Sequence, residues 1–108
     1  MPVDLEALWR EAQSFPRGEA YAQIETTGNY RIGVGARRGQ GNYFIEVIAT
    51  LCREGRPNLD EMEEKLRLIK ELKARGYSLI CEDDGSISCE MQLPRSRVES
   101  EVRALTAT

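Results

Sequence analysis

The sequence predicts an α+β protein in which helices pack on a five-stranded antiparallel sheet, with the element order α-β-β-β-α-β-β-α. Apolar residues recur at helical spacing in three segments and alternate with polar residues in five others. Turn-forming residues, mainly glycine, proline and asparagine, stand between these segments. The 108 residues fit one domain, and the 41% that are apolar can form its core without disulfides or metal. We therefore expect residues 1–108 to form a single domain.

The first segment predicts a short amphipathic helix near the N-terminus. Asp4 is placed to cap it, and Val3 can pack against Leu8 beside the cap. The helix should end near Ser14, because the residue before Pro16 is disfavoured in helical geometry. Its apolar positions are Leu5, Leu8, Trp9, Ala12 and Phe15.

Residues 21–37 alternate apolar and polar side chains, which predicts a hairpin of two strands. A three-residue loop at residues 27–29 pairs Ile24 with Ile32 and Ala22 with Val34, and it puts the apolar sets of both strands on one face. A similar alternation predicts a third strand over residues 43–51. With a six-residue loop at 37–42, Val34 lies opposite Ile45, so the three strands form a meander.

The spacing of apolar residues becomes helical after Asn58, which forms a capping box with Glu61. Gly76 closes this helix, which we expect to lie across the sheet as the main core element. Its apolar positions are Leu59, Met62, Leu66, Ile69 and Leu72.

Strands follow at residues 77–82 and 86–93, joined by a turn at Asp83-Asp84-Gly85. A capping box of Ser96 and Glu99 begins a short C-terminal helix with Val98, Val102 and Leu105 on its apolar side.

Charge and cysteine content argue against several functional classes. The net charge of −3 disfavours a surface given wholly to nucleic acid or to an anionic membrane. The three cysteines, Cys52, Cys81 and Cys89, have no CxxC spacing, and the chain has no histidine, so we expect no metal site and no cofactor. No secretion signal or membrane-spanning run is recognisable, and we expect a cytoplasmic protein with reduced thiols.

The sequence offers no set of catalytic residues. Without histidine, a Ser-His or Cys-His arrangement cannot form within one chain. Asp83 and Asp84 are adjacent in a predicted turn, where carboxylates are normally solvated, and Cys81 and Cys89 are expected to fill an apolar face. We therefore predict that the protein is not an enzyme.

The segment GVGARRGQGN, residues 33–42, is the most distinctive stretch of the chain. Its glycine spacing and its place between two strands do not fit a dinucleotide or phosphate-binding loop, which needs a helix N-terminus. Arg31, Arg37 and Arg38 lie in a stretch without acidic residues and could bind nucleic acid together with nearby tyrosines. A solvated hairpin loop is the alternative that we favour for residues 37–42.

Gly33 and Gly35 belong to the preceding strand, on the sheet face opposite the predicted core. Glycine within a strand often marks the close approach of another backbone, and Tyr21, Phe44 and Ile48 share this face. These five residues are our predicted partner-binding or dimer surface, and we expect a bulky residue at Gly35 to spoil binding without harming the fold. Two alternatives remain: a terminal helix covers this face, or the aromatic rings shelter the bare glycine backbone.

The element order resembles that of the type III secretion chaperone-like fold, in which a helix separates three strands from two and terminal helices flank them. The resemblance covers the whole chain but concerns topology alone, so no functional residue is carried over. It implies a homodimeric, non-enzymatic protein that binds another protein chain. We therefore predict a small adaptor, chaperone or assembly factor, and a nucleic-acid-binding module using Arg37 and Arg38 as the alternative.

Overall fold

A computed structural model of the chain describes residues 3–14, 16, 18–27, 30–50, 59–81 and 86–106. It confirms the α+β class and the predicted order of elements. These are α1 (Leu5–Gln13), β1 (Glu19–Thr27), β2 (Tyr30–Arg37), β3 (Tyr43–Thr50), α2 (Leu59–Ala74), β4 (Ser78–Cys81), β5 (Ser86–Leu93) and α3 (Arg95–Thr106). None of these helices is long and apolar enough to cross a membrane.

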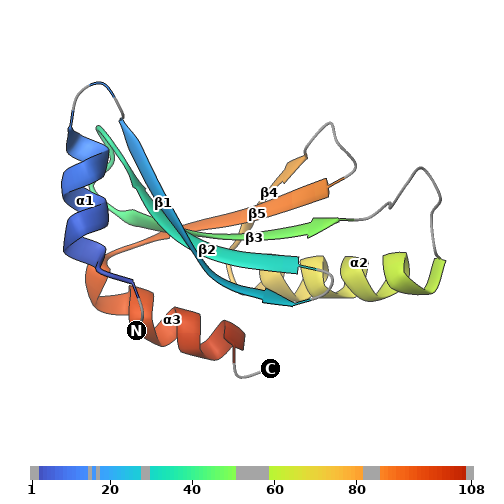
Figure 1. Cartoon of the computed structure of the whole chain (residues 1–108). Helices are drawn as coiled ribbons and strands as arrows, with labels where there is room; N and C mark the ends of the chain where they lie inside the picture. The colour runs from blue at the N-terminus through green and yellow to red at the C-terminus, as the bar shows by residue number, and fades with distance from the viewer. Residues whose placement is uncertain are drawn as a thin grey trace.

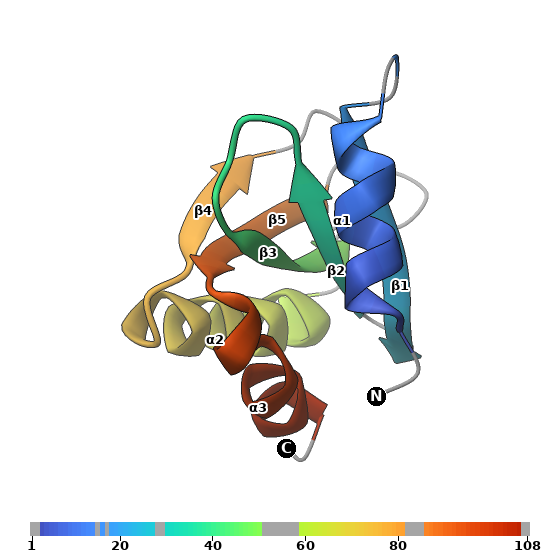
Figure 2. The same ribbon diagram turned by 90° about the vertical axis from the view of Figure 1, so that its left-hand side faces the viewer.

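The five strands form one antiparallel sheet in the order β1-β2-β3-β5-β4, so β1 and β4 are its edges (Figure 1). Helix α1 packs against β1 and β2, α3 against β3, and α2 against β4 and β5. All three helices contribute to a single core with one face of the sheet. The other face, which we call the open face, has none of the described helices over it (Figures 1 and 2). The alternative in which a terminal helix covers this face is therefore wrong.

The first hairpin has the predicted register at one end and a β-bulge at the other. Ala22 pairs with Val34 as expected, but Ile32 lies opposite Glu25 instead of Ile24, because the register shifts between Gln23 and Glu25. The pairing continues to Thr27 with Tyr30, which leaves two residues between them where three were predicted. The bulge takes up the extra residue, and Ile24 still packs against the core.

The second hairpin confirms that Val34 lies opposite Ile45. The last pair of β2 and β3 is Ala36 with Tyr43, which confirms the predicted spacing of six residues, but the first of these, Arg37, pairs with Glu19 of β1, and β2 ends at this residue. The turn that follows contains Gly39 at φ 84, and the Gln40 N–H donates to the Arg37 carbonyl oxygen at 3.2 Å. Arg37 is thus a strand residue of the open face and not a residue of the loop.

The helix ends follow from local chemistry. Asp4 caps α1, its carboxylate accepting a hydrogen bond from the Ala7 N–H at 3.1 Å, and α1 ends before Ser14 as predicted. Gly76 closes α2 at φ 105, and the Tyr77 N–H donates to the Leu72 carbonyl oxygen at 3.0 Å. The cap predicted for α2 at Asn58 lies outside the described residues, as does the turn at 83–85.

Two predictions for the helices are wrong. The C-terminal helix begins at Arg95 and not after a Ser96 cap, because Pro94 stands immediately before the first turn, where its missing N–H removes no hydrogen bond. The long helix buries only part of its apolar stripe: Ile69 and Leu72 are buried, whereas Leu59 is 77% exposed and Leu66 is half-exposed. Helix α2 packs mainly on β4 and β5, and only part of its apolar stripe is buried, so it contributes less to the core than its length predicts.

A buried phenol links the start of β4 to α3. The Tyr77 hydroxyl donates to the Glu101 carboxylate at 3.0 Å, and the Arg75 guanidinium donates to the same oxygen at 3.0 Å. Burial, followed by the negative charge of Glu101, raises the pKa of Tyr77 far above its ordinary value of 10.0. The phenol therefore stays protonated while the protein is folded.

We expect Tyr77→Phe to lower the free energy of unfolding by about 1–2 kcal/mol at pH 8, because it removes a buried hydrogen bond to a charged group. The folded pKa is raised, so the stabilisation is fully present below the unfolded pKa of about 10 and is lost as the pH rises above it. The gap between wild type and Tyr77→Phe should narrow by about 1 kcal/mol between pH 10 and pH 11. Urea unfolding at both pH values measures it, and a constant gap would contradict this account.

Candidate functional site

The two strand glycines of the open face are covered by aromatic rings from neighbouring strands. A Cβ atom on Gly33 would collide with the Tyr21 phenol, and one on Gly35 would collide with the Phe44 ring and lie 2.6 Å from the Ala20 carbonyl oxygen. The Tyr21 and Phe44 rings stack with centres 6.4 Å apart and planes inclined by 17°. The Tyr21 and Phe44 rings of the chain itself therefore fill the space left by the missing side chains of Gly33 and Gly35. At these two glycines the alternative applies in which aromatic rings shelter the bare backbone.

Arg37 lies over the same aromatic pair and ties it to β5. Its Cζ atom is 3.9 Å from the centre of the Phe44 ring, in the geometry of a cation–π contact. The guanidinium donates to both carboxylate oxygens of Glu90, with 3.2 Å between Nη2 and Oε2, and its Nε donates to Glu19 at 3.2 Å. The hydrogen bond to Glu90 is the main cause that raises the pKa of Arg37. We call Tyr21, Phe44, Arg37 and Glu90 the aromatic stack.

The three arginines predicted for nucleic acid do not form one cationic surface. Arg37 is paired with Glu90 and Glu19, although these acids are distant in sequence from the acid-free stretch. The Arg38 guanidinium donates to the Ser14 carbonyl oxygen, which holds it against the end of α1. Arg31 is exposed on β2. The expectation of an unopposed basic loop is therefore wrong for Arg37, while nucleic-acid binding by Arg31 and Arg38 stays a prediction.

An apolar row with a buried hydroxyl crosses the open face beside the aromatic stack. Ile48 on β3 pairs with Ser88 on β5, and Ser88 pairs with Ile80 on β4. Ser88 is 1% exposed, and its Oγ has no hydrogen-bond partner among the described residues. Ile80 is 42% exposed and Ile48 is partly buried. A buried hydroxyl without a partner is costly, so a polar group that reached Ser88 when a neighbouring isoleucine shifts on binding would be stabilised there.

A hollow of about 410 Å³ lies along β4 and β5 at the end of this row. Its lining combines hydroxyl, amide, carboxylate and apolar groups. The lining residues are Gly76, Ser78, Ile80, Glu90, Met91 and Gln92. Within the aromatic stack, Tyr21 on the edge strand β1 is 41% exposed, and burial followed by the charge of Glu46 raises the pKa of its phenol. The open face thus offers Tyr21 and Ile80 at its two edges.

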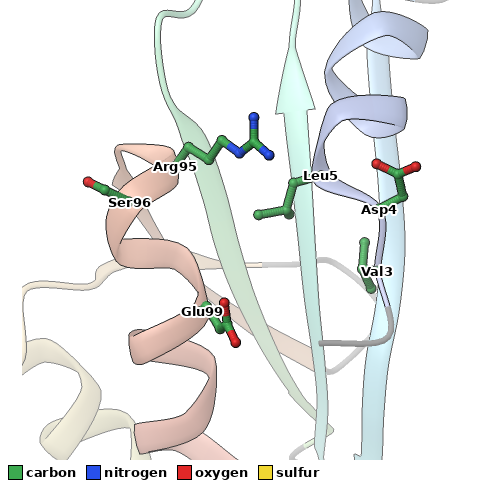
Figure 3. A pocket seen from close by; sticks show the side chains of 6 residues that line it. All are labelled: Val3, Asp4, Leu5, Arg95, Ser96 and Glu99. Atoms are coloured by element: carbon green, nitrogen blue, oxygen red, sulfur yellow. The ribbon is translucent and has the colours of Figure 1, made fainter.

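A second hollow of about 650 Å³ lies between the N-termini of α1 and α3 (Figure 3). Its charged groups come from both helices, and each has a partner. Asp4 caps α1, Arg95 donates to Glu6 at 2.6 Å, and Glu99 accepts from Arg103 at 2.7 Å. Val3, Leu5 and Ser96 complete the lining. The hollow is open and of mixed charge, and its groups hold the helix ends in place.

Acidic and sulfur-bearing side chains do not gather into a metal site in the part of the chain that the structure describes. Cys89 is a buried free thiol on the core face, and burial raises its pKa. Its surroundings therefore disfavour the reactive thiolate. Cys52 lies outside the described residues, as does the Cys81 side chain.

Sequence reasoning identified Tyr21, Phe44 and Ile48 as residues of one face, and the register confirms that they share it. It missed Ser88 and Glu90. Alternation over residues 86–93 placed both opposite the core side chains, but the pairing of β3 with β5 was needed to bring them beside Ile48 and Phe44.

Known protein families, curated proteins and solved structures were all compared with this chain, and none matches it.

Proposed function

We propose that this protein is a small, non-enzymatic protein-binding module, an adaptor, chaperone or assembly factor, that binds its partner on the open face of the sheet. The observation that carries the proposal is the row of Ile48, Ser88 and Ile80, in which apolar side chains flank a buried hydroxyl without a partner. A protein segment that brings an apolar side chain and one hydrogen-bonding group complements this row.

The aromatic stack makes the other part of the surface rigid before binding. The Tyr21 ring packs against Gly33 and the Phe44 ring. The Arg37 guanidinium, which forms an ion pair with Glu90, packs on the Phe44 ring. An exposed tyrosine that is already held in place loses little side-chain freedom on binding, and tyrosine is enriched among the residues that dominate protein interfaces. The element order, which resembles that of type III secretion chaperones, also supports a protein-binding role.

Photo-crosslinking from the open face tests this function. The photoreactive analogue p-benzoylphenylalanine replaces Tyr21, whose ring it resembles, and a control carries the analogue at Arg103 on the exposed side of α3. We expect crosslinks to a partner protein in cells from position 21 and not from position 103, and excess unlabelled wild type should abolish them. Adducts from both positions in equal yield would contradict the proposal.

Nucleic-acid binding is the competing outcome. Single-stranded RNA is titrated against the wild type and against the variant Arg31→Glu with Arg38→Glu at low salt. We expect no salt-sensitive binding that depends on these arginines. Association that weakens with salt and is lost in the variant would favour the nucleic-acid function instead.

A further inference from the structure

A third hollow, of about 240 Å³, lies on the helix side of the sheet, apart from the open face. Its lining residues are Trp9, Gly41, Tyr43 and Arg95, and we call it the tryptophan pocket. Trp9 belongs to α1 and Arg95 to α3, while Gly41 precedes β3 and Tyr43 begins it. The pocket therefore joins the two terminal helices to the start of β3.

The two aromatic rings of the pocket form a preformed stacking surface. The centres of the Trp9 and Tyr43 rings are 5.3 Å apart, and their planes are inclined by 23°. Tyr43 is 4% exposed and its hydroxyl donates to the Leu5 carbonyl oxygen at 2.8 Å, so the pair is anchored in the core. Trp9 is only partly buried, so part of its indole is available to a further planar ring.

The space beside Gly41 is empty. Apart from its chain neighbours, no atom lies within 4 Å of a Cβ added there, whereas the corresponding space at Gly33 and Gly35 is filled by rings. The φ angle of Gly41 lies outside the left-handed region, so the backbone does not require glycine at this position. The pocket is smaller than the roughly 300–1,000 Å³ of sites for drug-sized ligands, so its volume suits one ring with a short arm.

Arg95 alone is charged among the described residues that line the pocket. Its side chain extends from α3 toward α1 (Figure 3), where Nη1 donates to Glu6 at 2.6 Å. Nε and Nη2 have no partner among the described residues, and such a pair of donors matches the two oxygens of a carboxylate. The negative charge of Glu6 beside the guanidinium favours a carboxylate over a doubly charged phosphate.

We propose that the tryptophan pocket binds a small aromatic carboxylate, in which a short arm joins a single ring to a carboxyl group. The ring packs against the Trp9 indole in the space beside Gly41, and the carboxylate accepts hydrogen bonds from Nε and Nη2 of Arg95. The ligand contacts α1, α3 and the loop before β3 at once, so its binding stabilises the folded chain. This site is separate from the open face and does not depend on the protein-binding role.

Titration of the full chain with phenylacetate tests the pocket, because Trp9 is the only tryptophan of the chain and its fluorescence reports on the site directly. We expect a saturable change with a dissociation constant on the order of 0.1–1 mM, as for a ligand of about ten non-hydrogen atoms. 2-Phenylethanol lacks the charge and acetate lacks the ring, so each should bind at least about tenfold more weakly. The midpoint of thermal unfolding should rise with phenylacetate concentration.

Two substitutions at exposed positions separate recognition of the acid from recognition of the ring. Arg95→Gln should weaken phenylacetate binding at least about tenfold and leave 2-phenylethanol binding unchanged. Arg103→Gln is the matched control, because it makes the same change at another α3 arginine that pairs with an exposed glutamate. Gly41→Leu should weaken the binding of both compounds, since the leucine side chain takes up the empty space. Circular dichroism checks that each variant folds.

A wild type without a saturable response to phenylacetate overturns the proposal. So does equal affinity for phenylacetate and 2-phenylethanol, because the guanidinium would then contribute nothing. A folded Arg95→Gln or Gly41→Leu variant that binds phenylacetate like the wild type also overturns it. Equal loss of binding in Arg103→Gln does the same, since the effect would then follow the charge of α3 and not the pocket.

Discussion

Gly35→Ala is expected to lower the free energy of unfolding by about 3 kcal/mol, at the upper end of the cost of overpacking a core. The added Cβ would lie 2.6 Å from the carbonyl oxygen of Ala20, a backbone atom of the paired strand, and would also collide with the Phe44 ring. The ring can move, but the carbonyl oxygen can move only if β1 and β2 separate. The sequence-based expectation that a bulky residue at Gly35 leaves the fold intact is therefore reversed.

Two other alanine variants serve as comparisons for Gly35→Ala, and urea or thermal unfolding measures the stability of each. Gly41 has no atom within 4 Å of an added Cβ, so Gly41→Ala should change the stability by less than about 1 kcal/mol. The atoms nearest to an added Cβ at Gly33 belong to the Tyr21 side chain, so Tyr21→Ala should relieve the cost of Gly33→Ala, whereas Phe44→Ala should not rescue Gly35→Ala. Equal stability of Gly35→Ala and Gly41→Ala would contradict the close approach of β1.

Arg37→Met is expected to lower the free energy of unfolding by about 3 kcal/mol, because it leaves the Glu90 carboxylate without its charged partner. The Glu90 side chain is 10% exposed, so water cannot replace the two hydrogen bonds that Arg37 donates. The methionine also lacks the guanidinium that lies over the Phe44 ring. The cost stays at the lower end of the range for buried pairs, because Arg37 itself is partly exposed.

A double-mutant cycle with Glu90→Leu measures this coupling. The double variant should recover most of the stability lost in Arg37→Met, since it removes the buried charge together with its partner. Glu90→Leu alone should cost less than Arg37→Met, because Arg37 keeps its contact with Glu19. Additive effects of the two substitutions would show that the pair does not act as a unit.

The hairpin registers were the part of the fold most open to prediction. Period-two alternation sets the face of each residue, and a turn of given length then sets the pairing, as it did for Val34 with Ile45. The bulge beside Ile24 escaped prediction, because a three-residue loop and a two-residue loop with a bulge fit the same apolar pattern. The local apolar pattern therefore predicts which face of the sheet a residue occupies more reliably than it predicts the length of the loop between two strands.

The candidate site was less predictable, because its contacts join strands that are distant in sequence. The position of Gly33 and Gly35 on the open face followed from alternation, but which ring fills which space depends on side-chain directions across neighbouring strands. The pairing of Arg37 with Glu90 depends on β5 lying beside β3. The exposed half of α2 escaped prediction because helical spacing shows which side is apolar and not how far the sheet extends beneath it.

The contact between the Tyr21 phenol and Gly33 constrains how this protein can evolve. A side chain can appear at position 33 only after the ring at position 21 has been replaced by a smaller residue, and a ring can return at 21 only while 33 is glycine. The two positions should therefore covary among descendants of this sequence. No substitution of a neighbouring side chain makes room at position 35, because the obstructing atom is a backbone oxygen. We therefore expect glycine at position 35 in every descendant that keeps this hairpin.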